Sequence, residues 1–425
     1  MQRAEGGRVR LPFGRTLIAQ PAGRIAVIDF IRGFALLGIL AINVTGFWGP
    51  QLATFSPLWP RAEPGAAAWY ATAFVLFEGK MRALFTVLFG ASLILFIEAA
   101  ERRGANGDLA QARRLCWLAL IGYAHYLLLW WGDILFAYAL CGLLALALRR
   151  MPPAGLAAFG LMLFVFSHGL AAIGDLAGIA AEARVLAGRA STAEMADQAA
   201  MMQRIAASMT LDTRILNAGF GQAIGLRLAN APLLPFETTL ATLTETFPLI
   251  LLGMALYGSG FFGGGWSRQT LRQLAWGGIG GGGAISLALL GWIWQHDFPP
   301  RAMFAMLGAL TAVPHLLMAL GYAAALLLAF PRLERSRAGQ RIAAAGRTAL
   351  TNYLGTTLLM CAIFSGWGLG LGPEMPRGWL PACVVLGWAA MLAWPEAWLA
   401  RFGIGPMEAL WRKLTWWGEG RVFGR

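Results

Sequence analysis

Ten apolar segments constrain the fold of this chain more than any other feature of its sequence. They lie at residues 26–48, 67–98, 115–131, 134–148, 154–181, 236–262, 274–295, 302–330, 342–366 and 379–400. About 20 apolar residues in a row span the hydrocarbon core of a bilayer as a helix, which satisfies its own backbone hydrogen bonds there. We therefore predict an all-α, polytopic integral membrane bundle of about ten transmembrane helices.

The composition agrees with helices rather than with strands. Hydrophobic residues make up 58% of the chain and charged residues 13%, and the mean hydropathy is +0.60. These values lie far from the usual balance of water-soluble proteins. A membrane β-barrel would show alternating segments of about ten residues instead, so the sequence indicates a bundle of helices.

Positive charges predict how the helices are oriented. Short cytoplasmic loops are enriched in Lys and Arg, and with the N-terminus inside, the basic clusters fall on the inner loops. The short outer loops hold Arg61, Arg301 and Arg377. An even number of spans with both termini in the cytoplasm follows. Orientation then accounts for the net charge of +13, so we expect membrane lipids as partners and no nucleic acid.

The predicted organisation has two membrane halves separated by one long loop. The segments are a cytoplasmic basic tail at 1–25, a first membrane half at 26–181, an extracytoplasmic, partly helical loop at 182–235, a second membrane half at 236–400 and a cytoplasmic amphipathic tail at 401–425. The N-terminal arginines run into the first apolar segment without a cleavage site of the A-x-A type, which indicates a retained first span. The arginines of the long loop do not contradict this topology, because long loops cross largely regardless of charge.

The sequence does not support the common cofactor and metal sites of soluble proteins. Gly278, Gly280 and Gly283 have the spacing G-x-G-x-x-G, but that motif binds dinucleotides only between a strand and a helix. Inside a span, small residues let helices pack closely. The four cysteines lie in apolar segments without a second Cys or a His at metal-ligand spacing. We therefore expect no disulfide, no metal site and no permanently bound cofactor.

Ionisable residues inside a span are costly, and so they mark candidate sites. Asp29 and Arg32 lie one turn apart near the start of the first span, where they can pair along one helix face. They form either an interfacial ion pair or a substrate site in which Asp29 orients Arg32 toward a phosphate or carboxylate. Asn43 lies further along the same span, where it contacts either substrate or a neighbouring helix.

Three charged residues interrupt the second span. Glu78, Lys80 and Arg82 lie about midway along it, with Gly79 between them. Three charges cannot face lipid, so a helix break at Gly79 beside a polar cavity is expected. We treat Glu78 as a candidate catalytic residue and Lys80 and Arg82 as candidate substrate-binding residues. Structural pairing among them is the alternative.

His125 is the candidate acid–base residue, because the proton affinity of imidazole suits such work near neutral pH. Its alternative is a packed histidine that bonds a carbonyl group. Within one helix it would lie about 12 Å from Asp133, at about 1.5 Å rise per residue, so the two should not touch. We expect Asp133 to cap the following helix and keep it as a candidate substrate-binding residue. The remaining histidines, His168, His296 and His315, are interpreted as structural.

Five sequence blocks resemble, in order and over nearly the whole chain, the YeiB-like bacterial inner-membrane proteins, a family with an uncharacterised domain. The blocks are "RIAVIDFIRGFALLGILAINV", "FEGKMRALFTVLFGASL", "HYLLLWWGDILFAYAL", "GRTALTNYLGTTLL" and "RFGIGPMEALWRKLTW". The resemblance implies a multi-pass protein of the bacterial inner membrane.

The first spans of that family are similar in turn to a wider group of membrane acyltransferases. In that group a D-x-x-R-G opening and a membrane-embedded His serve transfer of an acyl group from cytoplasmic acyl-CoA. Asp29, Arg32 and Gly33 match the opening. The resemblance therefore implies His125 as the catalytic base and acyl-CoA as a co-substrate.

The same resemblance suggests a role for the block around residue 350. Arg347 is followed about one turn later by Asn352 and Tyr353. This polar face suits a CoA phosphate or a lipid headgroup, so we treat the three as candidate substrate-binding residues.

The leading hypothesis is an integral-membrane acyltransferase whose acceptor is a lipid, a glycan or a small molecule. It requires Arg32, Glu78, Lys80, Arg82 and His125 to meet in one polar chamber. A transporter or lipid flippase would use the same buried residues without covalent chemistry, and a scaffold for partner proteins is a third reading. Whether the chain is an enzyme and whether it forms a homo-oligomer stay open from the sequence.

Overall fold

Helices account for almost all of the structure. The computed structural model describes residues 9–10, 16–17, 23–372 and 374–417, so most of the expected basic tail at 1–25 and the end of the tail at 401–425 lie outside the described residues. The helices are α1 (Gly23–Trp48), α2 (Ala66–Leu76), α3 (Lys80–Glu101), α4 (Gly107–Leu128), α5 (Leu135–Leu146), α6 (Pro153–Leu186), α7 (Thr192–Asn217), α8 (Phe220–Asn230), α9 (Leu234–Gly258), α10 (Arg268–Gln295), α11 (Pro300–Ala305), α12 (Ala312–Leu333), α13 (Arg337–Arg347), α14 (Ala349–Phe364), α15 (Leu380–Ala393), α16 (Pro395–Phe402) and α17 (Pro406–Thr415). Single turns are η1 (Gln51–Thr54), η2 (Phe261–Gly263), η3 (Met306–Leu310) and η4 (Arg377–Trp379), and the two-residue strands β1 (Val9–Arg10) and β2 (Thr16–Leu17) pair antiparallel.

Within the described residues, seven helical segments are long and apolar enough to cross a membrane. They are Ala26–Trp48, Ala66–Glu101, Pro153–Leu186, Leu234–Gly263, Arg268–Gln295, Ala312–Leu333 and Arg377–Phe402, and α5 and α14 are shorter apolar helices. The all-helical membrane fold is therefore confirmed. Each of the ten predicted apolar segments contains a helix, whereas the number of spans and their orientation stay predictions.

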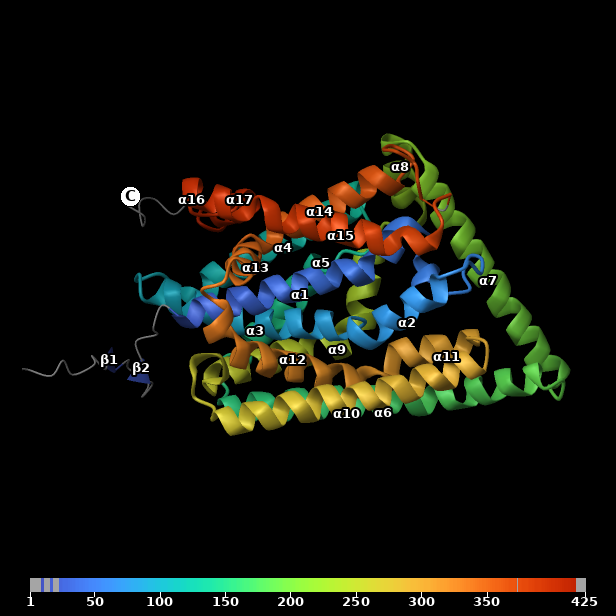
Figure 1. The fold of residues 1–425 in the computed structure, drawn as a ribbon, viewed down its shortest axis with the longest axis horizontal. Coiled ribbons are helices and arrows are strands. Elements are labelled where there is room, and N and C mark those ends of the chain that lie inside the picture. Colours follow the sequence, from blue (N-terminus) through green and yellow to red (C-terminus); the bar gives the residue numbers. More distant parts are fainter. Residues whose placement is uncertain (1–8, 11–15, 18–22, 373, 418–425) are drawn as a thin grey trace, which may run out of the picture.

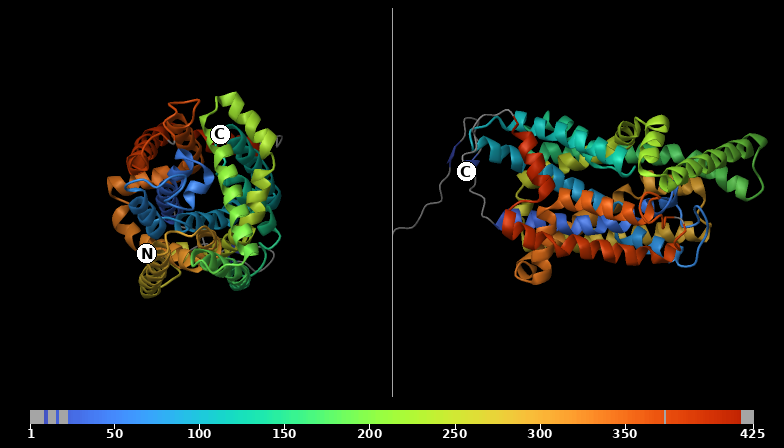
Figure 2. Two further views of the ribbon diagram at one scale, coloured as in Figure 1. Left: turned by 90° about the vertical axis from the view of Figure 1, so that its right-hand side faces the viewer. Right: turned by 90° about the horizontal axis from the view of Figure 1, so that it is seen from above.

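Both described ends of the bundle lie on the same side of the molecule. In Figure 1, α1 begins and α17 lies at the left, where α4 and α10 also begin. We call this the basic end, because many arginines come from the helix ends and loops there. They include Arg102, Arg114, Arg149, Arg268, Arg347 and Arg412. At the opposite end, α6 extends beyond the bundle and α7 runs back across it (Figures 1 and 2).

The first helix forms the centre of the bundle. Seen along the long axis in Figure 2, α1 lies near the middle, while α6 and α10 lie at the rim. Burial agrees with this view. Of an apolar stretch of 18 residues in each helix, 67% is buried in α1, against 22% in α6 and 28% in α10. Side chains of α6 such as Phe166 and Ile173 are exposed, as expected for a surface that faces lipid.

The second span breaks at Gly79, as predicted. Gly79 has φ = +69°, a conformation that favours glycine, and a Cβ there would lie 1.8 Å from His315 Nδ1. The break leaves carbonyl groups at the end of α2 without helical partners. Lys80 Nζ donates to the carbonyl oxygen of Phe74 at 2.5 Å, and the Tyr322 hydroxyl donates to that of Leu76 at 3.1 Å.

A second break lies between α4 and α5, where residues 129–134 are not helical. Two guanidinium nitrogens of Arg227, from α8, donate to the carbonyl oxygens of Leu127 and Leu129, each at 2.9 Å. The Tyr353 hydroxyl donates to the Gly132 carbonyl oxygen at 3.2 Å. Backbone groups inside a membrane protein need such partners, so the loop helix α8 stabilises the end of α4.

Glycines bring α1 and α13 into backbone contact. A Cβ on Gly33 would lie 1.9 Å from the Ile342 carbonyl oxygen, and one on Gly346 would lie 1.8 Å from that of Asp29. The contact places the first turns of α1 beside the residues that lead into α14. The glycine of the D-x-x-R-G opening therefore has a packing role in this fold.

We expect Gly33→Ala to lower stability by about 1–3 kcal/mol, because the added methyl group overpacks the contact with α13. Thermal unfolding in detergent measures the effect. Gly281→Ala is the matched control, since a Cβ at Gly281 meets open space and alanine favours a helix over glycine. Equal melting temperatures for the two variants would contradict the close packing at Gly33.

Candidate functional site

A cavity of about 230 Å³ lies at the basic end, between α1, α3, α4, α5, α13, α14 and α17. On α1 and α4, which enter it from that end, the polar residues come before the apolar ones. On α1, Arg32 precedes Leu36 and Ile39, and on α4, Gln111 and Arg114 precede Leu118. The cavity therefore has a cationic outer part and an apolar inner part, to which Phe85, Phe89, Leu135, Tyr138 and Tyr353 contribute.

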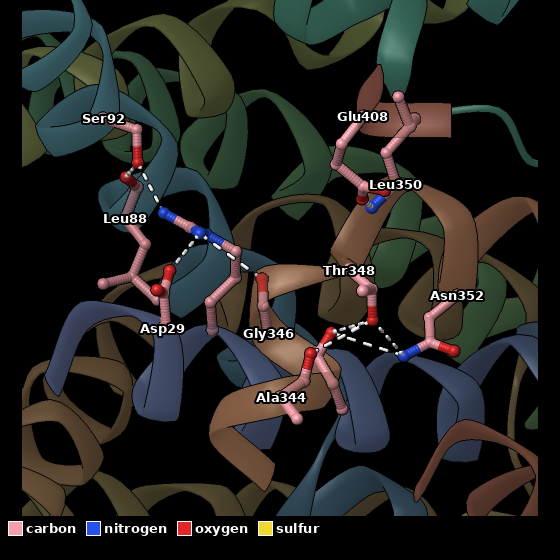
Figure 3. A network of polar contacts seen from close by, with 11 residues as sticks. Asp29, Leu88, Ser92, Ala344, Gly346, Thr348, Leu350, Asn352 and Glu408 are labelled. Atoms are coloured by element: carbon pink, nitrogen blue, oxygen red, sulfur yellow. Dashed lines mark hydrogen bonds and ion pairs between the residues drawn. The ribbon is translucent and has the colours of Figure 1, made fainter. Parts of the chain in front are cut away.

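The predicted pair of Asp29 and Arg32 is present. Arg32 Nη1 lies 2.7 Å from Asp29 Oδ1, while Nη2 donates to Ser92 Oγ of α3 at 2.8 Å. Nη1 also lies 3.4 Å from the Gly346 carbonyl oxygen, and Figure 3 shows Asp29, Ser92 and Gly346 around one guanidinium. Residues of three helices, α1, α3 and α13, thus hold Arg32 in place, with its side chain 21% exposed.

Two further arginines line the same cavity. The Arg114 guanidinium lies over the rings of Phe96 and Trp411, at 4.5 Å and 4.0 Å from their centroids. Stacking of this kind orients a planar cation. Arg347 Nη2 donates to the Gly403 carbonyl oxygen at 3.1 Å. Arginine residues of α1, α4 and α13 therefore line one small volume.

Glu408 is the carboxylate that α17 contributes to the lining of this cavity. Its oxygens accept hydrogen bonds from the first residues of α14. Glu408 Oε1 accepts hydrogen bonds from the backbone N–H groups of Leu350 at 2.7 Å and Thr351 at 3.1 Å, and Oε2 accepts one from the Thr351 hydroxyl at 2.5 Å. A carboxylate at a helix N-terminus stabilises the helix, because it satisfies free N–H groups and interacts favourably with the helix dipole. Glu408 thereby fixes α17 as one wall of the cavity (Figure 3).

His125 and Asp133 touch, so the expectation that they lie about 12 Å apart is wrong. His125 Nδ1 lies 3.0 Å from Asp133 Oδ1, because α4 ends at Leu128 and the chain turns back into α5. Asp133 Oδ2 also accepts the Phe136 backbone N–H at 2.8 Å, which agrees with the predicted capping of α5. At the other ring nitrogen, His125 Nε2 lies 3.1 Å from Thr357 Oγ1 of α14.

The structure separates the charges that we expected in one chamber, and that expectation is wrong. Lys80 bonds the end of α2, and Arg82 Nη2 lies 2.8 Å from Glu245 Oε2 of α9. Glu78 lines a different, smaller pocket, together with Tyr70 and Arg377. The physical reason is that the break at Gly79 turns these side chains toward different neighbours. Of the five, Arg32 reaches the large cavity.

The predicted site residues of α14, Asn352 and Tyr353, lie on different faces of the helix. Tyr353 lines the large cavity, and its ring centroid lies 5.0 Å from that of His125. Asn352 lies on another face, where its amide nitrogen is 3.3 Å from the carbonyl oxygens of Ala345 and Met391, and its Oδ1 accepts from Trp394 Nε1 at 2.9 Å. Asn352 therefore joins α14 to α15 and does not line the cavity, contrary to the face shared with Arg347 that we expected.

Asn43 lies in a small pocket deeper than the large cavity. Thr356, Thr357 and Tyr353 line this pocket together with Asn43. Leu36, Ile39 and Tyr353 line both pockets, so the two are neighbours along α1 and α14. Asn43 thus lines the same pocket as Thr357 and does not line the cavity of the arginines.

The three histidines that we interpreted as structural each contact a neighbouring group of the protein. His168 Nδ1 lies 2.7 Å from the Phe164 carbonyl oxygen, and His296 Nδ1 lies 2.7 Å from that of Trp292, which fits their structural interpretation. His315 packs against Gly79. Among the described residues, no group of three or more His, Cys, Asp or Glu side chains is placed to hold a metal ion.

Sequence reasoning missed Gln111, Arg114, Thr357 and Glu408. Gln111 and Arg114 lie in a helix that begins before the apolar segment at 115–131. The clustered arginines there indicate how the helix is oriented in the membrane, but they do not mark a binding site. Thr357 carries no charge, so nothing in its own segment marks it. Glu408 lies in the amphipathic tail, about 58 positions from its partner Leu350.

We expect Glu408→Gln to weaken the attachment of α17 to α14 by about 1–2 kcal/mol, because the hydrogen bonds lose their charge. Protease cleavage near residues 403–405 and thermal unfolding in detergent measure the loss. Glu396→Gln is the control, since Glu396 Oε2 lies 3.6 Å from Arg341 Nε in an exposed pair, and such pairs contribute little. Similar cleavage rates in both variants would contradict the capping role of Glu408.

Comparisons with known proteins agree on one family. Residues 256–418 match the model described as "Protein of unknown function (DUF418)". The uncharacterized protein YeiB of Escherichia coli (strain K12) is 31% identical over 397 residues, which cover 92% of this chain and 96% of YeiB. The uncharacterized protein YxaH of Bacillus subtilis (strain 168) is 27% identical over 415 residues, or 92% of this chain and 94% of YxaH. No solved structure matches the chain. The chain therefore belongs to the DUF418, or YeiB-like, family of membrane proteins of unknown function.

Proposed function

We propose that the protein is an integral-membrane acyltransferase that takes an acyl group from acyl-CoA and gives it to a lipid, glycan or small-molecule acceptor. The main support is the cavity at the basic end, which combines three guanidinium groups with an apolar interior. A ligand that matches both parts is an amphiphile with an anionic head and an apolar tail. Acyl-CoA has this chemistry.

The individual parts of acyl-CoA have matching partners in the cavity. Arg32, Arg114 and Arg347 suit phosphate groups, since guanidinium forms strong, oriented hydrogen bonds with phosphate oxygens. Gln111 is 1% exposed, and its Oε1 has no hydrogen-bond partner within the described chain. Leaving a buried acceptor unpaired is costly. An amide N–H of the pantetheine arm would satisfy it.

The candidate base lies directly beyond the apolar part. His125 contacts the ring of Tyr353, which lines the cavity, and Asp133 holds one ring nitrogen. A carboxylate that accepts from Nδ1–H leaves Nε2 free to take a proton. In this proposal His125 removes the proton from the attacking hydroxyl group, Asp133 orients His125, and acyl-CoA enters from the basic end, which we expect to face the cytoplasm of the inner membrane.

A transporter or flippase is the second candidate, and one observation favours it. Three pockets follow one another along α1 and α14, from Arg32 and Arg347 through Asn43 and Thr357 to a hollow lined by Gly46 and Cys361. Such a series also suits a substrate path from one end of the bundle to the other. The two functions differ in whether a covalent bond is broken.

The test uses purified protein in lipid nanodiscs with radiolabelled acetyl-, octanoyl- and palmitoyl-CoA. We expect Arg347→Ala to weaken acyl-CoA binding by about 10-fold or more, as loss of a charged hydrogen bond predicts. Arg341→Ala, which changes an exposed arginine of the same helix, is the control. We expect His125→Ala to retain binding and to lower turnover about 100- to 10,000-fold, while His168→Ala retains activity.

Absence of hydrolysis or transfer with every acyl-CoA tested would end the acyltransferase proposal. Movement of substrate across a sealed vesicle without acyl-CoA cleavage, unchanged in His125→Ala, would favour the transporter instead.

A further inference from the structure

We propose that Thr357 carries the acyl group covalently, as an ester on its Oγ1, between donor and acceptor. This inference rests on the proposed acyl transfer and names its nucleophile. Thr357, His125 and Asp133 come from α14, from α4 and from the turn after α4. They form the order hydroxyl, imidazole, carboxylate, with Oγ1 to Nε2 at 3.1 Å and Nδ1 to Oδ1 at 3.0 Å. This is the arrangement that activates a hydroxyl nucleophile.

In this proposal the protons are assigned as follows. Asp133 accepts the backbone N–H of Phe136 with Oδ2, its Oδ1 faces His125 Nδ1 at 3.0 Å, and the aspartate is assigned as a carboxylate. His125 then donates its Nδ1 proton to Asp133. Its Nε2 is left as an acceptor that faces the Thr357 hydroxyl.

Among the buried threonines of the described residues, Thr357 is the one whose hydroxyl reaches an imidazole nitrogen. Its Oγ1 lies 3.1 Å from the Tyr353 carbonyl oxygen one turn back, a common contact in membrane helices. Thr239 makes the same kind of contact, with the Pro235 carbonyl oxygen at 2.6 Å. A hydroxyl group can transfer its proton to an imidazole only if it lies within hydrogen-bond distance of a ring nitrogen. The Thr357 hydroxyl meets this condition, and the residue is 1% exposed.

Two further features give the donor a route and a stabilising group. Thr357 and Asn43 line the same small pocket. Tyr353, Leu36 and Ile39 separate this pocket from the arginine cavity and line both. The proposal requires the Tyr353 side chain to leave the Gly132 carbonyl oxygen, to which it donates at 3.2 Å, so that the two pockets join and a thioester held by the arginines reaches Thr357. The Asn43 amide then supplies an N–H donor to the oxyanion that forms on attack.

The atoms balance without any redox partner. Thr357 Oγ1 attacks the thioester carbonyl carbon while His125 Nε2 takes the hydroxyl proton. The carbon–sulfur bond breaks, and the leaving CoA sulfur takes that proton, which leaves an ester on Thr357. An acceptor hydroxyl then attacks the ester carbon as His125 takes its proton and returns it to Thr357 Oγ1. The products are CoA and the acylated acceptor.

The experiment traps the ester and locates it. Protein in nanodiscs is incubated without acceptor, either with [¹⁴C]octanoyl-CoA or with an alkyl fluorophosphonate, which labels activated hydroxyl groups whatever the natural donor. Peptide mass spectrometry then identifies the modified residue. We expect modification of Thr357 by both reagents, its loss in Thr357→Val and His125→Ala, and its retention in Thr357→Ser. Thr239→Val, with unchanged labelling at Thr357, is the matched control.

Each outcome separates this inference from the proposed function. Acyl transfer that continues in folded Thr357→Val would overturn the covalent step and leave the acyltransferase function intact, with direct attack by the acceptor. Labelling of Thr357 by the fluorophosphonate without any reaction of acyl-CoA would support the nucleophile and overturn the choice of donor. Labelling by neither reagent in folded protein would overturn the nucleophile.

Discussion

The structure depends on one constraint, that backbone N–H and C=O groups inside an apolar bundle must find partners within the protein. The chain breaks its helices twice inside the bundle, before Lys80 and after Leu128. At each break, side chains from distant segments complete the hydrogen bonding. Lys80 and Tyr322 bond the end of α2, and Arg227 bonds the end of α4. Without these partners each break would leave backbone carbonyl groups unpaired inside the apolar bundle.

This constraint explains why the buried charges do not converge. Lys80 is required at a carbonyl group, and Arg82 is required at Glu245, so neither is available to a shared chamber. The second break also brings His125 and Asp133 together. Because the chain leaves α4 after His125 and reverses, Asp133 comes back against the imidazole ring. An unbroken helix would have kept them apart.

Local spacing predicted part of this architecture. The pair of Asp29 and Arg32 follows from positions one turn apart, and the break at Gly79 follows from three charges that cannot face lipid. Apolar length predicted a helix in each of the ten segments. All of these arguments concern residues that are near one another in the chain. Contacts such as His125 with Thr357, 232 positions apart, depend on which helices become neighbours, and no alternation of polar and apolar residues encodes that choice.

The position of α17 has a consequence for biosynthesis. Glu408 and Trp411 form one wall of the arginine cavity, and they bind α14 and α4 respectively. The ribosome makes α4 long before it makes α17, so the earlier helices enter the membrane with this side of the hollow still open. During that interval Arg114 lacks the indole ring that later covers it. The wall that Glu408 and Trp411 contribute to the arginine cavity is thus completed only when α17 has been synthesised and docks against α4 and α14.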